Sequence, residues 1–218
     1  MFYRIAMFAV NLLWHLWFDL RLEGKENIPH HGGYILAGNH VSAMDPTVVC
    51  LGVRPRWGKL HFMSKAELFD IWGLRVIIRW LCAFPVARGK GDQTAIHTAY
   101  QVLEEGEILG IFPEGTRSKD GELLRFKSGL ALIAGHTQSP ILPVVITYSP
   151  KKSFRSRVVV RYGKPLSIEE LGLVGFNLEA PDARALKDAT RRTHAVMEEM
   201  LRQNQRELGL PIPTQEEE

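Results

Sequence analysis

Short apolar stretches recur along the chain and alternate with segments of helical periodicity. The apolar stretches are rich in β-branched and aromatic residues and fall at residues 34–37, 60–63, 83–86, 107–112, 141–147 and 157–162. A further short strand is expected from Arg21 to Gly24. Because strands that alternate with helices build layered domains, the pattern predicts one α/β domain with a largely parallel or mixed sheet flanked by helices.

Three helices are predicted from capping residues, over residues 92–105, 128–134 and 181–208. Asp or Ser near each start can accept hydrogen bonds from the first helical turn. A glycine follows each helix and can end it, at Gly106, Gly135 and Gly209. We therefore expect residues 21–209 to form the domain and residues 210–218 to form a loose acidic tail.

The first 20 residues are the most apolar part of the chain, and we expect them to form a membrane-associating helix. At about 100° per residue, the polar positions fall on one narrow stripe. These positions are Arg4, Asn11, His15 and Asp19. We interpret the helix as lying in the membrane interface, with Trp14 and Trp17 near the headgroups. The alternatives are a terminal helix packed on the core, a dimer interface and a full membrane span.

A second segment, residues 66–81, has the same aromatic and basic character. Its residues Trp72, Val76 and Trp80 would share one helical face, with Arg75 and Arg79 beside them. Aromatic residues flanked by arginines are typical of the headgroup boundary. A buried helix whose arginines reach outward is the alternative interpretation.

Composition and charge narrow the classes of function. The chain has 218 residues, 45% of them hydrophobic, which suits one domain with a substantial core. The net charge of +3 is too small to indicate a nucleic-acid partner. Basic residues nevertheless gather in residues 54–90 and 151–164, which fits a phosphate-bearing ligand, an anionic membrane or simply a solvated surface. Cys50 and Cys82 lie in apolar surroundings, which indicates free buried thiols and a cytoplasmic-side location.

The stretch AGNHVSAMDP, residues 37–46, places His40 and Asp45 on either side of a short turn after an apolar strand. Sites in α/β domains form beyond the carboxyl ends of strands. Histidine can take a proton from an attacking hydroxyl, and a carboxylate on its other nitrogen would orient it. Asp45 has a second interpretation, because an Asp followed by a Pro is also typical of a helix N-cap.

Two more strand ends carry candidate ligands for an anion. IFPEGTRS, residues 111–118, offers small residues with open backbone N–H groups, and Arg117 offers a bidentate fork. AFPVARGKG, residues 83–91, adds Arg88 and Lys90. An ordinary polar turn would explain the Gly and Thr of the first stretch but not its Arg.

Four motifs of the chain resemble those of a known enzyme family. NHVSAMD matches the motif of His, four residues and Asp of the glycerolipid acyltransferases, and FPEGTRS matches their phosphate-contacting motif. FPVAR and ILPV match the two lesser motifs, and all four occur in the family's order. The chain therefore resembles the bacterial 1-acylglycerol-3-phosphate acyltransferases.

The resemblance implies transfer of a fatty acyl group from an acyl thioester to the sn-2 hydroxyl of 1-acylglycerol 3-phosphate, giving phosphatidate in phospholipid biosynthesis. His40 would be the general base and Asp45 would orient it. The acceptor's phosphate would be held by Glu114, Gly115, Thr116, Arg117, Arg88 and Lys65. The thioester would be on coenzyme A or acyl carrier protein. No metal or cofactor is implied, and the enzyme would be a monotopic or peripheral protein on the cytoplasmic face of the cell membrane.

Other functions stay open at this point. An acyltransferase could accept another lysophospholipid, a lyso-aminolipid or glycerol 3-phosphate. A lipid hydrolase could use His40 to activate water, although no Gly-x-Ser-x-Gly elbow supports a serine hydrolase. A non-catalytic module that binds lipid phosphate is the third alternative.

Overall fold

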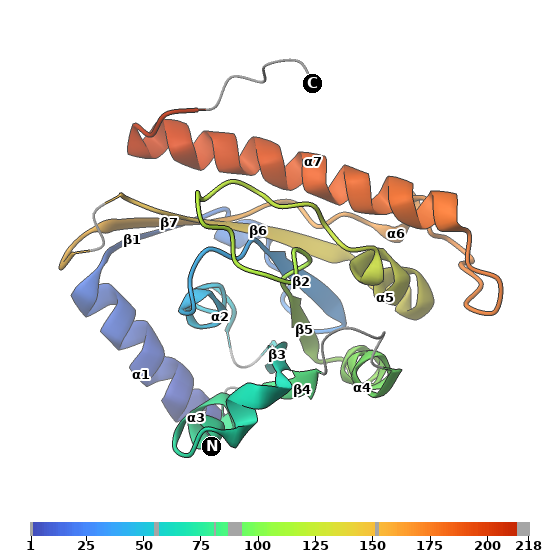
Figure 1. Cartoon of the computed structure of the whole chain (residues 1–218), viewed down its shortest axis with the longest axis horizontal. Coiled ribbons are helices and arrows are strands. Elements are labelled where there is room, and N and C mark those ends of the chain that lie inside the picture. Colours follow the sequence, from blue (N-terminus) through green and yellow to red (C-terminus); the bar gives the residue numbers. More distant parts are fainter. Residues whose placement is uncertain (1, 55–56, 81, 87–92, 151–152, 213–218) are drawn as a thin grey trace.

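A seven-stranded sheet organises the computed structural model, which describes residues 2–54, 57–80, 82–86, 93–150 and 153–212 (Figure 1). The strands are β1 (Asp19–Glu23), β2 (Tyr34–Gly38), β3 (Leu60–Lys65), β4 (Phe84–Val86), β5 (Ile108–Ile111), β6 (Ile141–Tyr148) and β7 (Arg157–Tyr162). Their order in the sheet is β1-β7-β6-β2-β5-β3-β4, and every pair is parallel except β6 with β7. The predicted α/β fold with a mixed sheet is confirmed.

The central strands consist of continuous apolar runs because both faces of the sheet are covered. All residues of β2 and β5 are buried, as are the first seven of β6. Successive side chains point to opposite faces, so Ile35 and Ala37 pack in one core cluster while Tyr34 and Leu36 pack in the other. Each expected apolar stretch corresponds to a strand.

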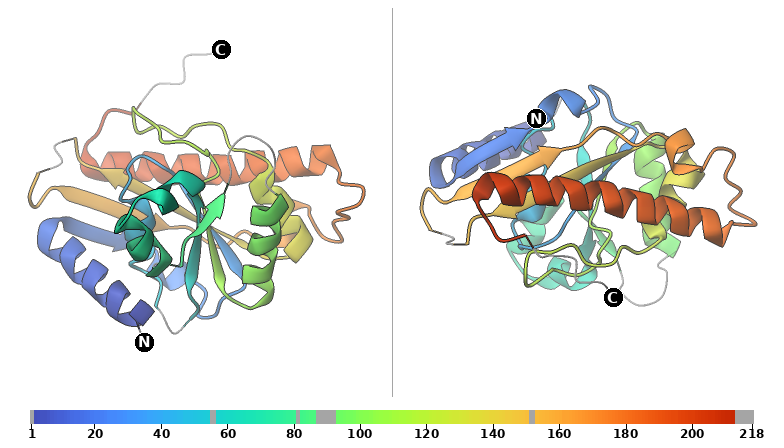
Figure 2. Two further views of the ribbon diagram at one scale, coloured as in Figure 1. Left: turned by 60° about the horizontal axis from the view of Figure 1, so that its bottom comes forward. Right: turned by 90° about the horizontal axis from the view of Figure 1, so that it is seen from above.

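Helices cover both faces of this sheet (Figures 1 and 2). One core cluster joins the sheet to α4 (Gln93–Glu104), α5 (Gly129–Thr137), α6 (Ile168–Leu171) and α7 (Ala183–Leu208). The other cluster joins it to α1 (Phe2–Trp17) and α2 (Asp45–Val48), and α3 (Leu74–Trp80) lies next to α1. Figure 2 shows α7 running along the length of the sheet.

The helix ends follow the predictions only in part. Asp182 accepts hydrogen bonds from the backbone of Arg184 and Ala185 at the start of α7, and Gly209 ends that helix as predicted. The predicted end of α5 was wrong, because the helix continues through Gly135 to Thr137. The predicted cap of α4, Asp92, lies outside the described residues.

The amphipathic helix α1 packs on the core with one face and exposes the other. Met7 and Trp14 are buried, and the Trp14 indole donates a 2.9 Å hydrogen bond to Thr47 Oγ1. The prediction that Trp14 lies near lipid headgroups was therefore wrong. The outward face is apolar, with Ile5, Phe8, Leu12, Leu13, Leu16 and Trp17 exposed. Within the described residues, no helix combines the length and the apolar character needed to cross a membrane.

The segment over residues 66–81 does not form the single helix that its pattern indicated. A 3-10 helix, η2 (Ala66–Asp70), is followed by Gly73 with a φ of +83°, and α3 begins only after this glycine. Trp72 therefore precedes the helix and is 89% exposed. Trp72 therefore does not lie on one helix with Val76 and Trp80, and the shared helical face that we expected does not form.

The two cysteines are free thiols with different burial. Cys50 is buried, as predicted, and its thiol donates to the Thr47 carbonyl. Cys82 is only half-buried, so its prediction as a buried thiol was wrong.

Candidate active site

The candidate site lies where three neighbouring strands end. β2 pairs in parallel with both β5 and β6, so the carboxyl ends of all three meet at one edge of the sheet. His40 follows β2, the stretch from Phe112 to Arg117 follows β5, and Tyr148 is the last residue of β6. The structure brings together the two residues of the first motif, with His40 Nδ1 2.8 Å from Asp45 Oδ2.

Asp45 is a fully buried carboxylate, and its oxygens face the His40 loop. Besides the His40 ring, Oδ2 accepts the backbone N–H groups of Val41 and Ser42, each at 2.7 Å. Oδ1 accepts the hydroxyl of Tyr148 at 2.8 Å. Met44 is the N-cap residue of α2, so the N-cap interpretation of Asp45 was wrong.

Tyr148 is a functional candidate that the sequence did not indicate. Burial, and then the negative charge of Asp45, raise the pKa of its hydroxyl, which therefore stays protonated and donates to the carboxylate. The two residues are 103 positions apart, and the pairing of β2 with β6 brings their segments together.

The His40 ring is held on a stack of aromatic rings. It lies 4.4 Å from the Phe112 ring at an interplanar angle of 23°, and Phe112 stacks in turn on Phe62. With Nδ1–H directed at Asp45, the neutral imidazole carries its lone pair on Nε2. Among the residues that the structure describes, nothing hydrogen-bonds to Nε2. The side chain is 19% exposed, which leaves that nitrogen accessible to a substrate proton.

Glu114 supports the His40 loop and does not face a ligand. Its Oε1 accepts the backbone N–H of His40 at 2.8 Å, and its Oε2 accepts that of Leu124 at 3.1 Å. The carboxyl is buried, and this burial raises its pKa. A carboxylate in these contacts offers no donor to a phosphate, so the phosphate role implied for Glu114 does not fit the structure.

Gly115, Thr116 and Arg117 of the second motif form a turn that is exposed at its last two residues. The N–H of Gly115 donates to the Phe112 carbonyl at 3.0 Å, so it is not the open donor that we expected. Thr116 and Arg117 are exposed, and Arg117 has no ion pair within the described part of the chain. The Arg117 guanidinium is therefore available to an anion.

Lys127 is a second cation at this turn that sequence reasoning missed. Gly115 has a φ of +70°, and a Cβ added there would lie 2.7 Å from Lys127 Nζ. The lysine amine thus lies against the turn that follows β5. The available signal was the basic pair Arg125 and Lys127 directly before the start of α5.

Two predicted phosphate ligands remain, Lys65 and Arg88. Lys65, the last residue of β3, forms a 3.0 Å ion pair with Glu67 in partly exposed surroundings. Arg88 lies outside the described residues. Among the residues that the structure describes, no three His, Cys, Asp or Glu side chains gather as they would around a metal ion.

Comparison with known proteins gives consistent matches. The acyltransferase family model matches residues 19–147. A 1-acyl-sn-glycerol-3-phosphate acyltransferase of Bacillus subtilis is 30% identical over 167 residues, which cover 75% of this chain and 82% of that protein. One of Borreliella burgdorferi is 31% identical over 158 residues, covering 69% and 60% respectively.

A solved structure is also similar over nearly the whole chain. It is the crystal structure of the 1-acyl-sn-glycerophosphate acyltransferase PlsC of Thermotoga maritima, which superposes with a TM-score of 0.70 at 26% identity. The match covers 95% of this chain and 81% of that one.

Proposed function

Because this chain belongs to the acyltransferase family, we propose that the His40 site is where it transfers an acyl group to a lipid hydroxyl. The enzyme is an O-acyltransferase that converts 1-acylglycerol 3-phosphate to phosphatidate. The acyl group comes from a thioester. The observation that carries the proposal is the 2.8 Å contact between His40 Nδ1 and Asp45, which leaves Nε2 as the base.

The reaction needs one proton acceptor and no covalent enzyme intermediate. Nε2 of His40 takes the proton from the sn-2 hydroxyl while that oxygen attacks the thioester carbonyl carbon. The tetrahedral intermediate then expels the thiolate. The thiolate takes the proton from the imidazolium and leaves as the free thiol. General-base help of this kind contributes about 10² to 10⁴ in rate.

The surroundings of the pair suit this role. The charge of Asp45 stabilises the imidazolium that forms, and the hydroxyl of Tyr148 fixes the carboxylate from its other side. Glu114 holds the backbone N–H of His40, and the His40 carbonyl accepts the N–H of Ser118 at 2.7 Å. The loops after β2 and β5 are therefore fixed to each other, which preorganises the base.

The acceptor's phosphate is assigned to the exposed turn after β5. Arg117 supplies a bidentate fork, and Lys127 supplies an ammonium beside Gly115. Both cations lie on the loops that the Glu114 carboxylate ties to His40. This arrangement anchors the charged end of the lipid next to the base.

The acyl chains are expected to reach the site from a membrane surface. The outward apolar face of α1 suits attachment to the lipid interface. An apolar hollow of about 340 Å³ lies between α1 and residues Met44 and Thr47, which flank Asp45 and Pro46 in the chain. Attachment through α1 would therefore place the lipid phase next to the catalytic loop.

The test of the proposal is His40→Ala in an assay with labelled acyl thioester and 1-acylglycerol 3-phosphate. We expect turnover to fall at least about a hundredfold because the base is lost. The protein should stay folded, because Asp45 keeps its hydrogen bonds from Val41, Ser42 and Tyr148. His97→Ala, at an exposed histidine of α4, is the matched control and should keep full activity.

Two results would contradict the proposal. Near-normal turnover of His40→Ala would remove the base from the mechanism. Fatty acid released by the wild type at the same rate with and without acceptor would indicate the hydrolase instead. A panel that includes lysophosphatidylcholine, a lyso-aminolipid and glycerol 3-phosphate tests the acceptor separately.

A further inference from the structure

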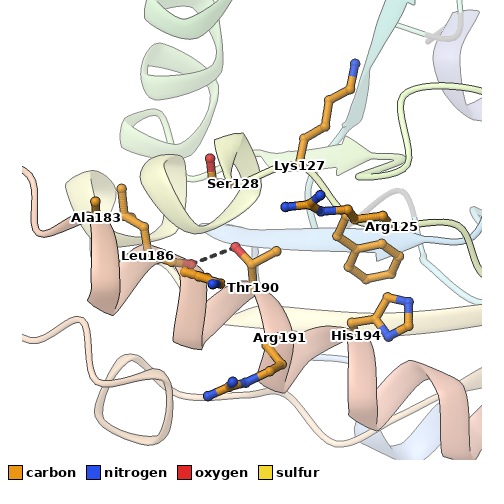
Figure 3. A pocket seen from close by; sticks show the side chains of 10 residues that line it. Arg125, Lys127, Ser128, Ala183, Leu186, Thr190, Arg191 and His194 are labelled. Carbon is orange, nitrogen blue, oxygen red and sulfur yellow. Dashed lines mark hydrogen bonds between the residues drawn. The ribbon is translucent and has the colours of Figure 1, made fainter. Parts of the chain in front are cut away.

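A basic groove runs between the chain before α5 and the first half of α7 (Figure 3). Its volume is about 970 Å³. One wall is residues 125–128, and the other is the part of α7 that carries Leu186, Lys187, Thr190 and Arg191. Neither motif of the candidate site explains this groove.

Three of the four Lys and Arg side chains that line the groove are not neutralised. Arg125, Lys127 and Lys187 are exposed and have no ion pair within the described part of the chain. Two acids of α7 already have partners, since Asp188 pairs with Arg191 at 2.9 Å and Glu198 lies 4.0 Å from His194.

The second half of α7 differs from the first in that both of its arginines are paired with acids. Arg202 is paired there with Glu122 and Glu198, and Arg206 with Glu199. Positive charge without a partner is therefore concentrated at the groove end of α7, which favours an anionic ligand.

The groove also has an apolar floor. Phe126 is buried at its base, in edge contact with the His194 ring, and Leu186 is partly buried beside it. The Thr190 hydroxyl is already used, because it donates to the Leu186 carbonyl at 2.7 Å. Cations around an apolar floor fit a ligand with both a planar ring and phosphates, and the volume falls in the range of small-molecule sites, about 300–1,000 Å³.

Lys127 links the groove to the catalytic site. Its backbone N–H donates to the Pro113 carbonyl at 2.9 Å, and its amine lies against Gly115. Figure 3 shows Lys127 pointing away from α7, while the Arg125 guanidinium lies between the two walls. A ligand in the groove would therefore have one end near Arg125 and the other near the turn that follows β5.

We propose that this groove binds the nucleotide end of a coenzyme A thioester, the acyl donor. Arg125 and Lys187 contact its phosphates, the adenine ring lies on the floor at Phe126 and Leu186, and the pantetheine arm runs past Lys127 towards His40. The inference rests on the proposed function, which requires a thioester. It adds the chemical class of the donor and the residues that recognise it.

The first experiment measures binding without catalysis. Adenosine 3′,5′-bisphosphate is titrated by calorimetry into wild type, the double variant Arg125→Ala/Lys187→Ala and the control Lys164→Ala. Lys164 is also an exposed lysine without an ion pair in the described residues, and it lies outside the groove. We expect the double variant to bind at least about tenfold more weakly, and the control to bind like wild type.

The second experiment measures the same three proteins during turnover. The KM for acyl-coenzyme A should rise at least about tenfold in the double variant. Its KM for an acyl-pantetheine thioester, which lacks the nucleotide, should not change. The KM for 1-acylglycerol 3-phosphate and kcat should also stay constant.

Several results would overturn the inference. Equal affinity of all three proteins for the bisphosphate would show that the groove does not hold the nucleotide. A rise confined to the KM for the acceptor would assign the groove to the lipid phosphate. A loss of activity in the double variant that is seen only with an acyl carrier protein thioester as donor would assign the groove to an acidic protein surface. A wild type that forms no diacyl product with any donor would refute the proposed function, while the calorimetry still decides the groove.

Discussion

Asp45 accepts hydrogen bonds from four donors with a single carboxylate. The donors are the His40 ring, two backbone N–H groups of the following turn and the Tyr148 hydroxyl. A buried charge is tolerated only when it is paired or well hydrogen-bonded, and these contacts satisfy that condition. The same contacts fix the tautomer of His40. Asp45 therefore both stabilises the loop and leaves Nε2 of His40 free to act as the base.

Replacing Asp45 by Asn tests the negative charge of this side chain while keeping its shape. The Asn carbonyl can take the place of Oδ2, and its NH₂ can donate to the Tyr148 oxygen, so we expect the loop to stay folded. The imidazolium would lose its counter-charge, and kcat should fall at least about a hundredfold. Asp182→Asn, at the N-cap of α7, is the control. Full activity of Asp45→Asn would show that the carboxylate is only structural.

Arg117 tests the phosphate site. We expect Arg117→Ala to raise the KM for 1-acylglycerol 3-phosphate about tenfold, with a smaller change in kcat, because the exposed guanidinium anchors the acceptor rather than the reacting atoms. Lys119→Ala removes a neighbouring exposed cation and should change little. An unchanged KM in Arg117→Ala would assign the acceptor's phosphate to other residues.

At this scale the sequence predicted local contacts and missed distant ones. His40 and Asp45 are five positions apart, so their contact could be expected from the motif itself. The inward turn of Glu114 depends on the Leu124 backbone, and the Tyr148 contact depends on strand pairing. Such roles follow from tertiary packing, which a motif does not encode.

Among the elements, α1 shows why Trp14 could not be placed correctly from composition alone. The helix is apolar on two faces, and periodicity does not say which face meets the sheet. The structure buries Met7 and Trp14 and leaves Phe8 and Leu13 exposed. The core-packed interpretation is therefore confirmed for the face with Met7 and Trp14, and the interfacial interpretation stays a prediction for the exposed apolar face.

The outward face of α1 is expected to carry membrane attachment. Phe8→Gln combined with Leu13→Gln should weaken sedimentation with anionic vesicles at least about tenfold, because each change removes about 1.5–3 kcal/mol of apolar burial. The fold should persist, since both side chains are exposed. Met7→Gln is the contrasting variant, and it should lower the free energy of unfolding because Met7 is buried. Undiminished vesicle binding of the double variant would place attachment elsewhere.

Across the whole molecule, burial affects titration as well as packing. Burial raises the pKa of the Cys50 thiol to about 12, from an ordinary value of 9.0. The thiol lies in the core cluster on the α1 side of the sheet and donates to the Thr47 carbonyl. The folded protein therefore keeps a proton on Cys50 that the unfolded chain releases above about pH 9.

This difference predicts how stability changes with pH. The contribution of Cys50 is fully present below pH 9 and is lost as the pH rises towards 12, where the unfolded chain binds one proton fewer. The free energy of unfolding should therefore fall with a contribution of up to about 1.4 kcal/mol per pH unit from this thiol. Urea unfolding between pH 8 and about pH 10.5 measures that slope, which Cys50→Ala should make shallower. Cys82→Ala, at a half-buried thiol whose pKa is also raised by burial, should change it less. An identical slope in wild type and Cys50→Ala would show that the thiolate is accommodated in the core.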